Sequence, residues 1–208
     1  MSDKLNPILL LSKKIKSIAD IGLLYSKNEY DTERYTELLD ISFELLHLLT
    51  GKKIELLKHL YSNAQEYPTA KVDIRGVLLL NGKILLVKES ADGKWSLPGG
   101  WADIGYSPRE VIIKEFKEET GLDVVPEKLL AVFDKKMHAH PPQLFYVYKF
   151  VFLCTAVSTE IKKGFDILNV DYFDINNLPE LSEDRILASQ LQLLYKKIVE
   201  HDTMTYCD

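Results

Sequence analysis

Three glutamates lie close together in the segment EFKEE, at positions 115, 118 and 119. In a helix, residues three and four apart lie on one side, so we expect Glu115, Glu118 and Glu119 to present their carboxylates to a single point. Carboxylates packed that closely repel one another, and a hard divalent cation bound among them relieves the repulsion. Oxygen ligands in an incomplete protein cage suit Mg²⁺ or Mn²⁺, completed by water and phosphate oxygens. The residue types alone favour a solvated charged face, whereas the spacing permits a metal site.

The sequence marks both ends of the helix that must carry these glutamates. Ser107, Pro108 and Glu110 predict a capping box with proline at the first helical position. Gly121 stands where a left-handed residue would end the helix. Three apolar residues lie on a flank away from the glutamates, and we expect this flank to face the core: Ile112, Ile113 and Phe116.

A loop with two glycines precedes the helix. Because glycine has no Cβ, backbone carbonyl groups of Pro98, Gly99 and Gly100 can approach the same metal. Loop, capping box, carboxylates and glycine stop all lie between residues 98 and 122, directly after a predicted strand and hairpin. This fixed frame favours the metal site over the solvated face.

The frame resembles the Nudix hydrolase box, G-x5-E-x7-R-E-U-x-E-E-x-G-U, where U is a bulky apolar residue. The positions that match the box are Gly100, Glu115, Phe116, Glu118, Glu119, Gly121 and Leu122. Two positions depart from it, because Tyr106 replaces the usual glutamate and Lys114 the usual arginine. In the family these two residues commonly pair, so the two replacements alter a contact that supports the loop and the helix. Asp103 can supply a substitute carboxylate or be an exposed loop acid without a further role.

The resemblance implies metal-assisted hydrolysis of a diphosphate. By this resemblance Glu115, Glu118 and Glu119 are the catalytic residues and hold Mg²⁺, or Mn²⁺, with the Gly100 carbonyl as a further ligand. The metal would polarise phosphorus and lower the pKa of a bound water. The general base stays open between Glu118 and a downstream acid, for which the candidates are Glu160, Asp166 and Asp171.

Composition narrows the class of protein. The chain has 208 residues, of which 46% are hydrophobic and 27% charged, enough for an ordinary globular core. The net charge of −5 argues against sequence-independent binding of nucleic acid. We find neither a signal peptide pattern nor an apolar run long enough to span a membrane. Cys154 and Cys207 do not suggest a disulfide framework, so we expect a cytoplasmic protein.

The N-terminal third predicts a separate helical domain, residues 1–66. We expect helices at residues 5–25, from Asp31 to Leu49 with Asp31 as the cap, and at residues 52–61. A linker at residues 65–70 leads to the second domain, residues 67–208. The helices carry more apolar surface than they can cover among themselves. This surplus predicts a homodimer through the helices, although they can also pack on the second domain of the same chain.

The second domain alternates strands and helices. Residues 72–80 and 84–87 predict a hairpin through Asn81 and Gly82, and further strands are expected at 129–133, 144–154 and 170–173. Ser182 is expected to cap a last helix over residues 183–200. The Nudix resemblance implies an α/β/α sandwich with a mixed sheet, which agrees with this order. Arg75, on the first strand, can reach a substrate phosphate or be an ordinary surface arginine.

The segment KKMHAHPP contains His138 and His140. Their i, i+2 spacing is weak evidence for a metal, and we expect these two residues at the substrate mouth, with Tyr146 among the aromatic residues that follow; a plain proline-rich turn is comparably supported. The chain resembles a Nudix subgroup with a helical N-terminal domain in GLLYSKNEYDTERYTELL, KVDIRG, GKWSLPGGWADIGYSP, HAHPP and LPELSEDR.

This subgroup is associated with ADP-ribose or CDP-choline pyrophosphatase activity. We therefore expect hydrolysis of a small-molecule nucleoside diphosphate linked to a moiety X, giving a nucleoside monophosphate and X-phosphate. One alternative is a Nudix hydrolase acting on RNA ends or as an exonuclease, and the lack of a basic stripe counts against it. The other is a non-catalytic nucleotide-ligand sensor, which would typically have eroded the glutamates and appended a DNA-binding domain.

Overall fold

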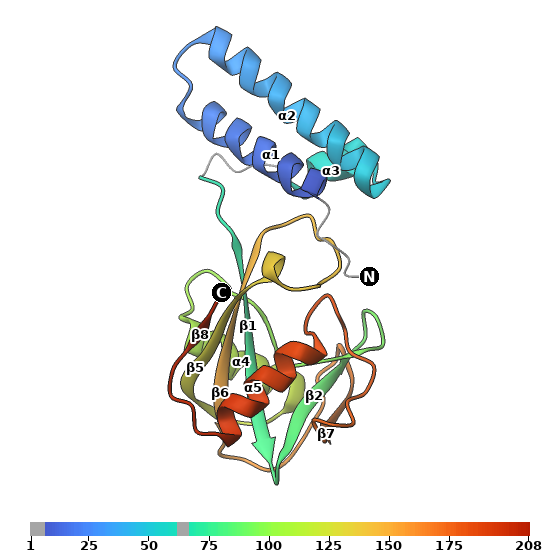
Figure 1. Ribbon diagram of the computed structural model, residues 1–208, viewed down its shortest axis with the longest axis vertical. Helices are drawn as coiled ribbons and strands as arrows, with labels where there is room; N and C mark the ends of the chain where they lie inside the picture. The colour runs from blue at the N-terminus through green and yellow to red at the C-terminus, as the bar shows by residue number, and fades with distance from the viewer. Residues whose placement is uncertain (1–6, 62–66) are drawn as a thin grey trace. The chain divides into compact units, whose positions relative to one another are not determined.

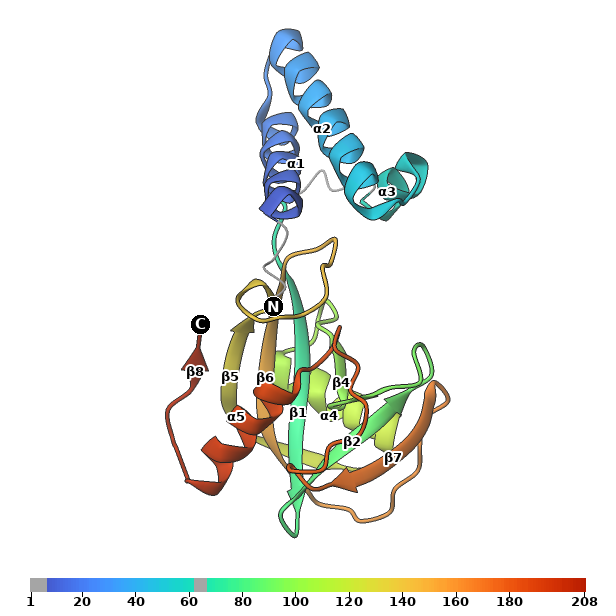
Figure 2. The same ribbon diagram turned by 45° about the vertical axis from the view of Figure 1, so that its right-hand side comes forward.

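The computed structural model describes residues 7–61 and 67–208. The chain divides into two compact units, one of residues 1–70 with 142–146, the other of residues 71–141 and 147–208. Residues 5 and 6 of the first expected helix, and residues 65 and 66 of the expected linker, lie outside the described ranges. Figure 1 and Figure 2 show helices in the first unit and a sheet with helices in the second.

The helical unit contains α1 (Pro7–Tyr25), α2 (Glu29–Thr50) and α3 (Ile54–Leu60). Asn28 caps α2, since its side chain accepts a hydrogen bond from the Asp31 N–H. The expectation that Asp31 is the cap was therefore wrong, because an asparagine three residues earlier fulfils the same role. Gly51 ends α2 in the left-handed conformation.

A short segment from later in the chain packs in this helical unit. Tyr61 donates a hydrogen bond to the Leu144 carbonyl, and Lys13 Nζ donates to the Phe145 carbonyl at 3.1 Å. These carbonyls are thus bound by side chains, so the strand expected from residue 144 begins only at residue 147. Buried at the centre of the unit are Leu9, Phe43, Leu46 and Leu57.

The second unit is a mixed sheet with a helix on each face (Figure 1). Its strands are β1 (Lys71–Leu80), β2 (Lys83–Glu89), β3 (Trp95–Ser96), β4 (Gly99–Trp101), β5 (Val124–Asp134), β6 (Val147–Ala156), β7 (Ile167–Phe173) and β8 (Tyr206–Cys207). The order is β3-β2-β1-β6-β5-β8, with β4 paired to β1 and β7 to β2. Strands β1 and β6 are parallel, whereas β2 and β4 run antiparallel to β1. The predicted α/β sandwich with a preceding helical region is confirmed.

Helix α4 (Pro108–Thr120) covers one face of the sheet and α5 (Ala188–Val199) the other, and a 3₁₀ turn, η1 (Lys135–Met137), follows β5. The α4 core includes Ile112 and Phe116 as predicted, both with 0% exposure. Ile113 is 41% exposed, so its expected place in the core was wrong. Val111, one helical turn before Glu115, is buried instead of Ile113.

The hairpin between β1 and β2 forms as predicted. Asn81 and Gly82 have φ values of 50° and 75°. Two successive residues with positive φ match the type I′ turn that suits the twist of paired strands.

Helix α5 begins later than predicted, at Ala188. Ser182 Oγ donates a hydrogen bond to Asp92 Oδ2 at 2.6 Å, and Arg185 contacts the same carboxylate at 3.1 Å. The Ser182 hydroxyl therefore binds a distant loop and does not cap a helix. None of the helices in the described ranges is both long and apolar enough to cross a membrane.

The two isoleucines of α4 give a matched test of the fold. We expect Ile112→Ala to lower the free energy of unfolding by about 3 kcal/mol, because it leaves a cavity in the core. Ile113→Ala should lower it by less than about 1 kcal/mol, since that side chain is largely solvated. Urea unfolding followed by the fluorescence of Trp95 and Trp101 measures both. Equal losses for the two variants would contradict the orientation of α4.

Candidate active site

Helix α4 has the predicted capping residues at both ends. Ser107 and Glu110 form the reciprocal capping box. The Glu110 N–H donates to Ser107 Oγ at 3.4 Å, and the Ser107 N–H donates to Glu110 Oε2 at 2.7 Å. Gly121 ends the helix with φ 76°. The glutamates lie in the last two turns of this capped helix, where Glu115 and Glu119 face strand β4.

The glycines of β4 contact two of the three carboxylates. The Gly99 N–H donates a hydrogen bond to Glu119 Oε2 at 2.9 Å. A Cβ at Gly100 would lie only 2.7 Å from Glu115 Oε1. A Cβ at Gly99 would lie 2.1 Å from the Ile74 carbonyl oxygen on β1. Any larger residue at either position would therefore displace β4 or the carboxylates.

Burial makes these carboxylates costly to ionise. Burial raises the pKa of Glu119 to about 8, although the Arg75 charge and the Gly99 N–H favour the ionised form. Burial also raises the pKa of Glu115, Arg75 opposes the rise, and the negative charge of Glu118 adds to it. A divalent cation at this position would stabilise the ionised forms.

The carboxylates do not all converge on one point as the sequence suggested. The Glu118 side chain is 59% exposed, with Oε2 3.9 Å from Lys114 Nζ, while Glu119 turns inward to the Gly99 N–H. Accordingly, residues 7–61 and 67–208 include no group of three acidic, histidine or cysteine side chains arranged to hold a metal by themselves. The oxygen-only donor set and the close fit of Gly100 to Glu115 nevertheless suit a hard cation that keeps water and phosphate ligands.

Lys114 forms an ion pair that replaces the usual glutamate–arginine pair of the box. Its Nζ lies 2.9 Å from Asp103 Oδ2. The loop acid thus pairs with the base across loop and helix, in the manner that the resemblance implies for the usual glutamate and arginine.

Arg75 is buried, with 7% exposure. It donates hydrogen bonds to Asp73 Oδ1 at 2.8 Å and to the Leu97 carbonyl at 3.0 Å, and it lies 3.8 Å from Glu89. Its charge also acts on Glu115 and Glu119. The Nε and Nη1 donors of Arg75 are therefore directed to protein groups, while its charge acts on the two carboxylates.

Sequence analysis missed the ionic network around Arg75. Lys149 of β6, with 0% exposure, pairs with Asp73 of β1. Although burial favours the neutral acid, Arg75 and Lys149 lower the pKa of Asp73 to about 2. Arg185 reaches Glu89 at 3.2 Å. Charged residues at alternate positions of otherwise apolar strands are the sequence signal that could have found Asp73, Arg75 and Lys149.

The two histidines contact groups from the C-terminal part of the chain. His138 Nε2 is 2.9 Å from Asp208 Oδ2. His140 Nδ1 is 2.6 Å from the Glu183 carbonyl, so Nδ1 carries the proton. Burial lowers the pKa of His140 to about 4, and its Nε2 has no hydrogen-bond partner within the described structure. Tyr146 belongs to the helical unit, where Lys13 Nζ lies 5.2 Å from its ring centre.

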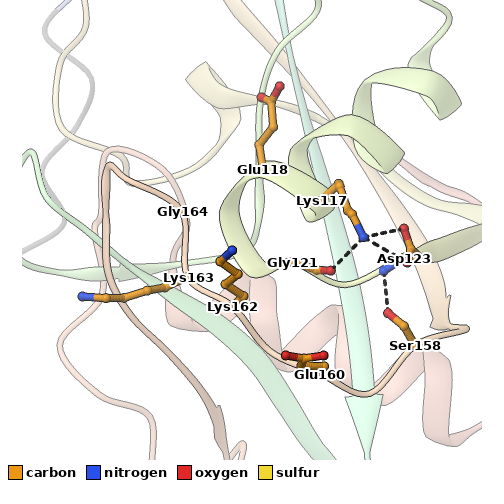
Figure 3. A pocket seen from close by; sticks show the side chains of 9 residues that line it. All are labelled: Lys117, Glu118, Gly121, Asp123, Ser158, Glu160, Lys162, Lys163 and Gly164. Atoms are coloured by element: carbon orange, nitrogen blue, oxygen red, sulfur yellow. Dashed lines mark hydrogen bonds and ion pairs between the residues drawn. The ribbon is translucent and has the colours of Figure 1, made fainter.

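An open hollow of about 610 Å³ adjoins the C-terminal end of α4 (Figure 3). Glu118 and Glu160 both line it. Of the other two downstream acids, Asp171 lies on β7 opposite Leu86, and Asp166 accepts a hydrogen bond from the Ser90 N–H through its backbone carbonyl. Of the three downstream acids, Glu160 is therefore the one that lines the same hollow as Glu118.

Family comparison agrees with this geometry. The NUDIX domain model matches residues 71–194, and the model "UDP-X-like, N-terminal oligomerisation domain" matches residues 6–61. The chain belongs to the Nudix family. It is a Nudix hydrolase that carries the helical N-terminal domain, and Nudix hydrolases generally use a divalent metal, typically Mg²⁺.

Several known Nudix proteins are similar to this one. YjhB of Bacillus subtilis (strain 168), which carries the provisional name ADP-ribose pyrophosphatase, is 40% identical over 95% of both chains. The solved structure of a UDP-X diphosphatase is 33% identical, with a TM-score of 0.64, over 99% of this chain and 100% of that one. An ADP-ribose pyrophosphatase from Streptococcus suis 89-1591 is 35% identical, with a TM-score of 0.62, over 67% of this chain and 100% of that one.

We expect Glu118→Gln to fold normally and to lose nearly all turnover. Its exposed side chain contributes little to stability, whereas removing one charge at the reacting centre should lower kcat on the order of a hundredfold or more. Glu200→Gln is the matched control, because Glu200 also lies 3.9 Å from a lysine four residues earlier. Steady-state kinetics at saturating Mg²⁺ measures both. Activity of Glu118→Gln within about tenfold of the parent would remove Glu118 from the mechanism.

Proposed function

We propose that this Nudix hydrolase cleaves the diphosphate linkage of nucleoside diphosphate-X compounds, giving a nucleoside monophosphate and X-phosphate. The observation that carries the proposal is the contact of Glu115 and Glu119 with the β4 glycines. This contact gathers the oxygen donors of Glu115 and Glu119 at the end of α4 that also carries the exposed Glu118. The ADP-ribose pyrophosphatase name of one relative, which aligns over 95% of this chain, supports the same reaction class.

In the proposed mechanism Glu115, Glu118, Glu119 and the Gly100 carbonyl would hold Mg²⁺. The bound cation would neutralise charge on the diphosphate and lower the pKa of a water. Glu119 is fixed by the Gly99 N–H, and Glu115 is fixed by its fit against Gly100. Exposed Glu118 is the candidate that accepts the proton of the attacking water, and Glu160 is the alternative on the same hollow.

ADP-ribose and CDP-choline remain the predicted substrates. The names of two relatives support ADP-ribose, while the UDP-X diphosphatase structure adds UDP-linked compounds. For recognition of the nucleoside and of X we propose His138, His140 and Tyr146. We propose that Arg75 acts on the phosphates indirectly, through its charge on the Glu115 and Glu119 carboxylates. Its Nε and Nη1 groups already donate to protein oxygens.

The helical unit has an exposed apolar surface that suits self-association. Its members are Ile8, Leu11, Ile18, Tyr25, Tyr30, Ile41, Leu48, Leu56 and Leu60. The N-terminal model that matches residues 6–61 is described as an oligomerisation domain. We therefore propose a homodimer formed through these helices, with domains at residues 1–66 and 67–208. Both cysteines are free, which agrees with the proposed cytoplasmic location.

A substrate panel tests the proposed reaction. Purified protein is incubated with Mg²⁺ and ADP-ribose, CDP-choline, UDP-sugars, NADH or nucleoside triphosphates, and the products are separated by chromatography. We expect a nucleoside monophosphate and X-phosphate from at least one diphosphate-linked compound. Cleavage of triphosphates alone, with release of pyrophosphate, would contradict the assignment, and binding without cleavage would favour the sensor alternative.

Light scattering tests the dimer. We expect a mass of twice the 23.9 kDa of one chain. Leu48→Glu, which places a charge on the 77% exposed Leu48 of α2, should lower the dimer fraction, whereas Met204→Glu at a comparably exposed site should not. A mass near 23.9 kDa over a broad concentration range would exclude the dimer.

A further inference from the structure

The segment of residues 158–164 lines the hollow beside α4 and is attached to the helix by its backbone. The Lys162 N–H donates to the Thr120 carbonyl at 2.8 Å, and the Gly164 N–H donates to the Glu119 carbonyl at 3.0 Å. The last carbonyls of a helix have no partner within the helix, so these bonds complete the C-terminal end of α4. The segment therefore keeps a fixed position relative to the glutamates.

Gly164 makes this attachment possible. A Cβ at Gly164 would lie 2.3 Å from the Glu118 carbonyl oxygen and 3.3 Å from the Glu119 Cα. Both are backbone atoms, which cannot move aside without moving the helix. A side chain at residue 164 would thus separate the segment from α4 or shift the two glutamates.

Three lysines line the hollow, and they differ in their partners. Lys117 pairs with Asp123 at 2.9 Å, and Lys163 Nζ donates to the Leu168 carbonyl at 3.2 Å. Lys162 has no carboxylate within ion-pair distance in the described part of the chain. Figure 3 shows its side chain directed toward the end of α4, whereas that of Lys163 points away.

The charge balance of the hollow changes when the metal site is filled. Lys117 and Asp123 neutralise each other and Lys163 points away from the end of α4, which leaves Lys162 opposite Glu118 and Glu160. A cation held by Glu118 offsets that carboxylate, so the hollow then has an excess of positive charge. An ammonium group with free donors beside a bound cation suits a phosphate oxygen.

We propose that Lys162 binds a phosphate oxygen of the nucleoside diphosphate-X substrate, and that Gly164 is the positioning residue that holds Lys162 beside Glu118. This inference rests on the proposed function and adds a phosphate-binding residue outside the glutamate helix. The lysine acts as a point charge, so it strengthens substrate binding and leaves the chemical step to the glutamates.

Kinetics of matched lysine variants test the proposal on whichever diphosphate-linked compound the parent cleaves. We expect Lys162→Ala to raise KM about tenfold, with kcat within about twofold of the parent, and Lys162→Arg to restore most of the affinity. Lys163→Ala is the control from the same segment and should leave KM within about twofold. Gly164→Ala should lower kcat as well, because it displaces the glutamates.

Two results would overturn the assignment: a KM for Lys162→Ala within about twofold of the parent, or an equal rise for Lys163→Ala. Binding of inorganic pyrophosphate with Mg²⁺, measured by calorimetry, separates this inference from the proposed function. If the parent cleaves no diphosphate-linked compound, the proposed function fails. In that case weaker pyrophosphate binding by Lys162→Ala alone would still support the phosphate site, and unchanged binding would refute it.

Discussion

The site depends on the close approach of a glycine strand to the end of one helix. Because Gly99 and Gly100 have no side chains, β4 lies against Glu115 and Glu119, and the two carboxylates are drawn out of solvent. Burial first, and neighbouring negative charges second, raise the pKa of each carboxyl and so favour the neutral forms. This arrangement is unfavourable for two isolated acids and suitable for acids that bind a cation. The capping box, the Gly121 stop and the attachment of Gly164 each serve to hold this approach in place.

Buried positive charge is the second part of the same arrangement. Arg75 faces both carboxylates from β1 and is itself held by Asp73 and Glu89. Lys149 completes the pairing of Asp73 on the neighbouring strand. Buried pairs of this kind are costly when one partner is lost, so the network fixes where Arg75 can point. The sheet therefore contributes more than a scaffold, because the Arg75 charge acts on Glu115 and Glu119 of helix α4.

The sequence was most informative where local chemistry decides structure. The helix that carries Glu115, its caps and the Asn81-Gly82 hairpin were all predictable, because caps and turns depend on neighbouring residues. Errors arose where distant groups compete, as when Asp92 binds Ser182 and α5 begins later. Side-chain direction was likewise beyond the sequence: helical spacing put the three glutamates on one side, but only the fold shows that Glu119 turns to Gly99 while Glu118 faces solvent. The ion pairs of Arg75 and the place of Lys162 at the hollow required the same long-range information.

The central claim is that these carboxylates act by holding a divalent cation on a diphosphate. Its most direct test is turnover of the best-cleaved nucleoside diphosphate-X compound after divalent ions are removed with excess chelator, followed by titration with Mg²⁺. The account predicts that turnover is lost on removal and returns with added Mg²⁺, and that Glu115→Gln shifts the return to higher Mg²⁺ concentration. Turnover that persists unchanged in excess chelator would contradict it.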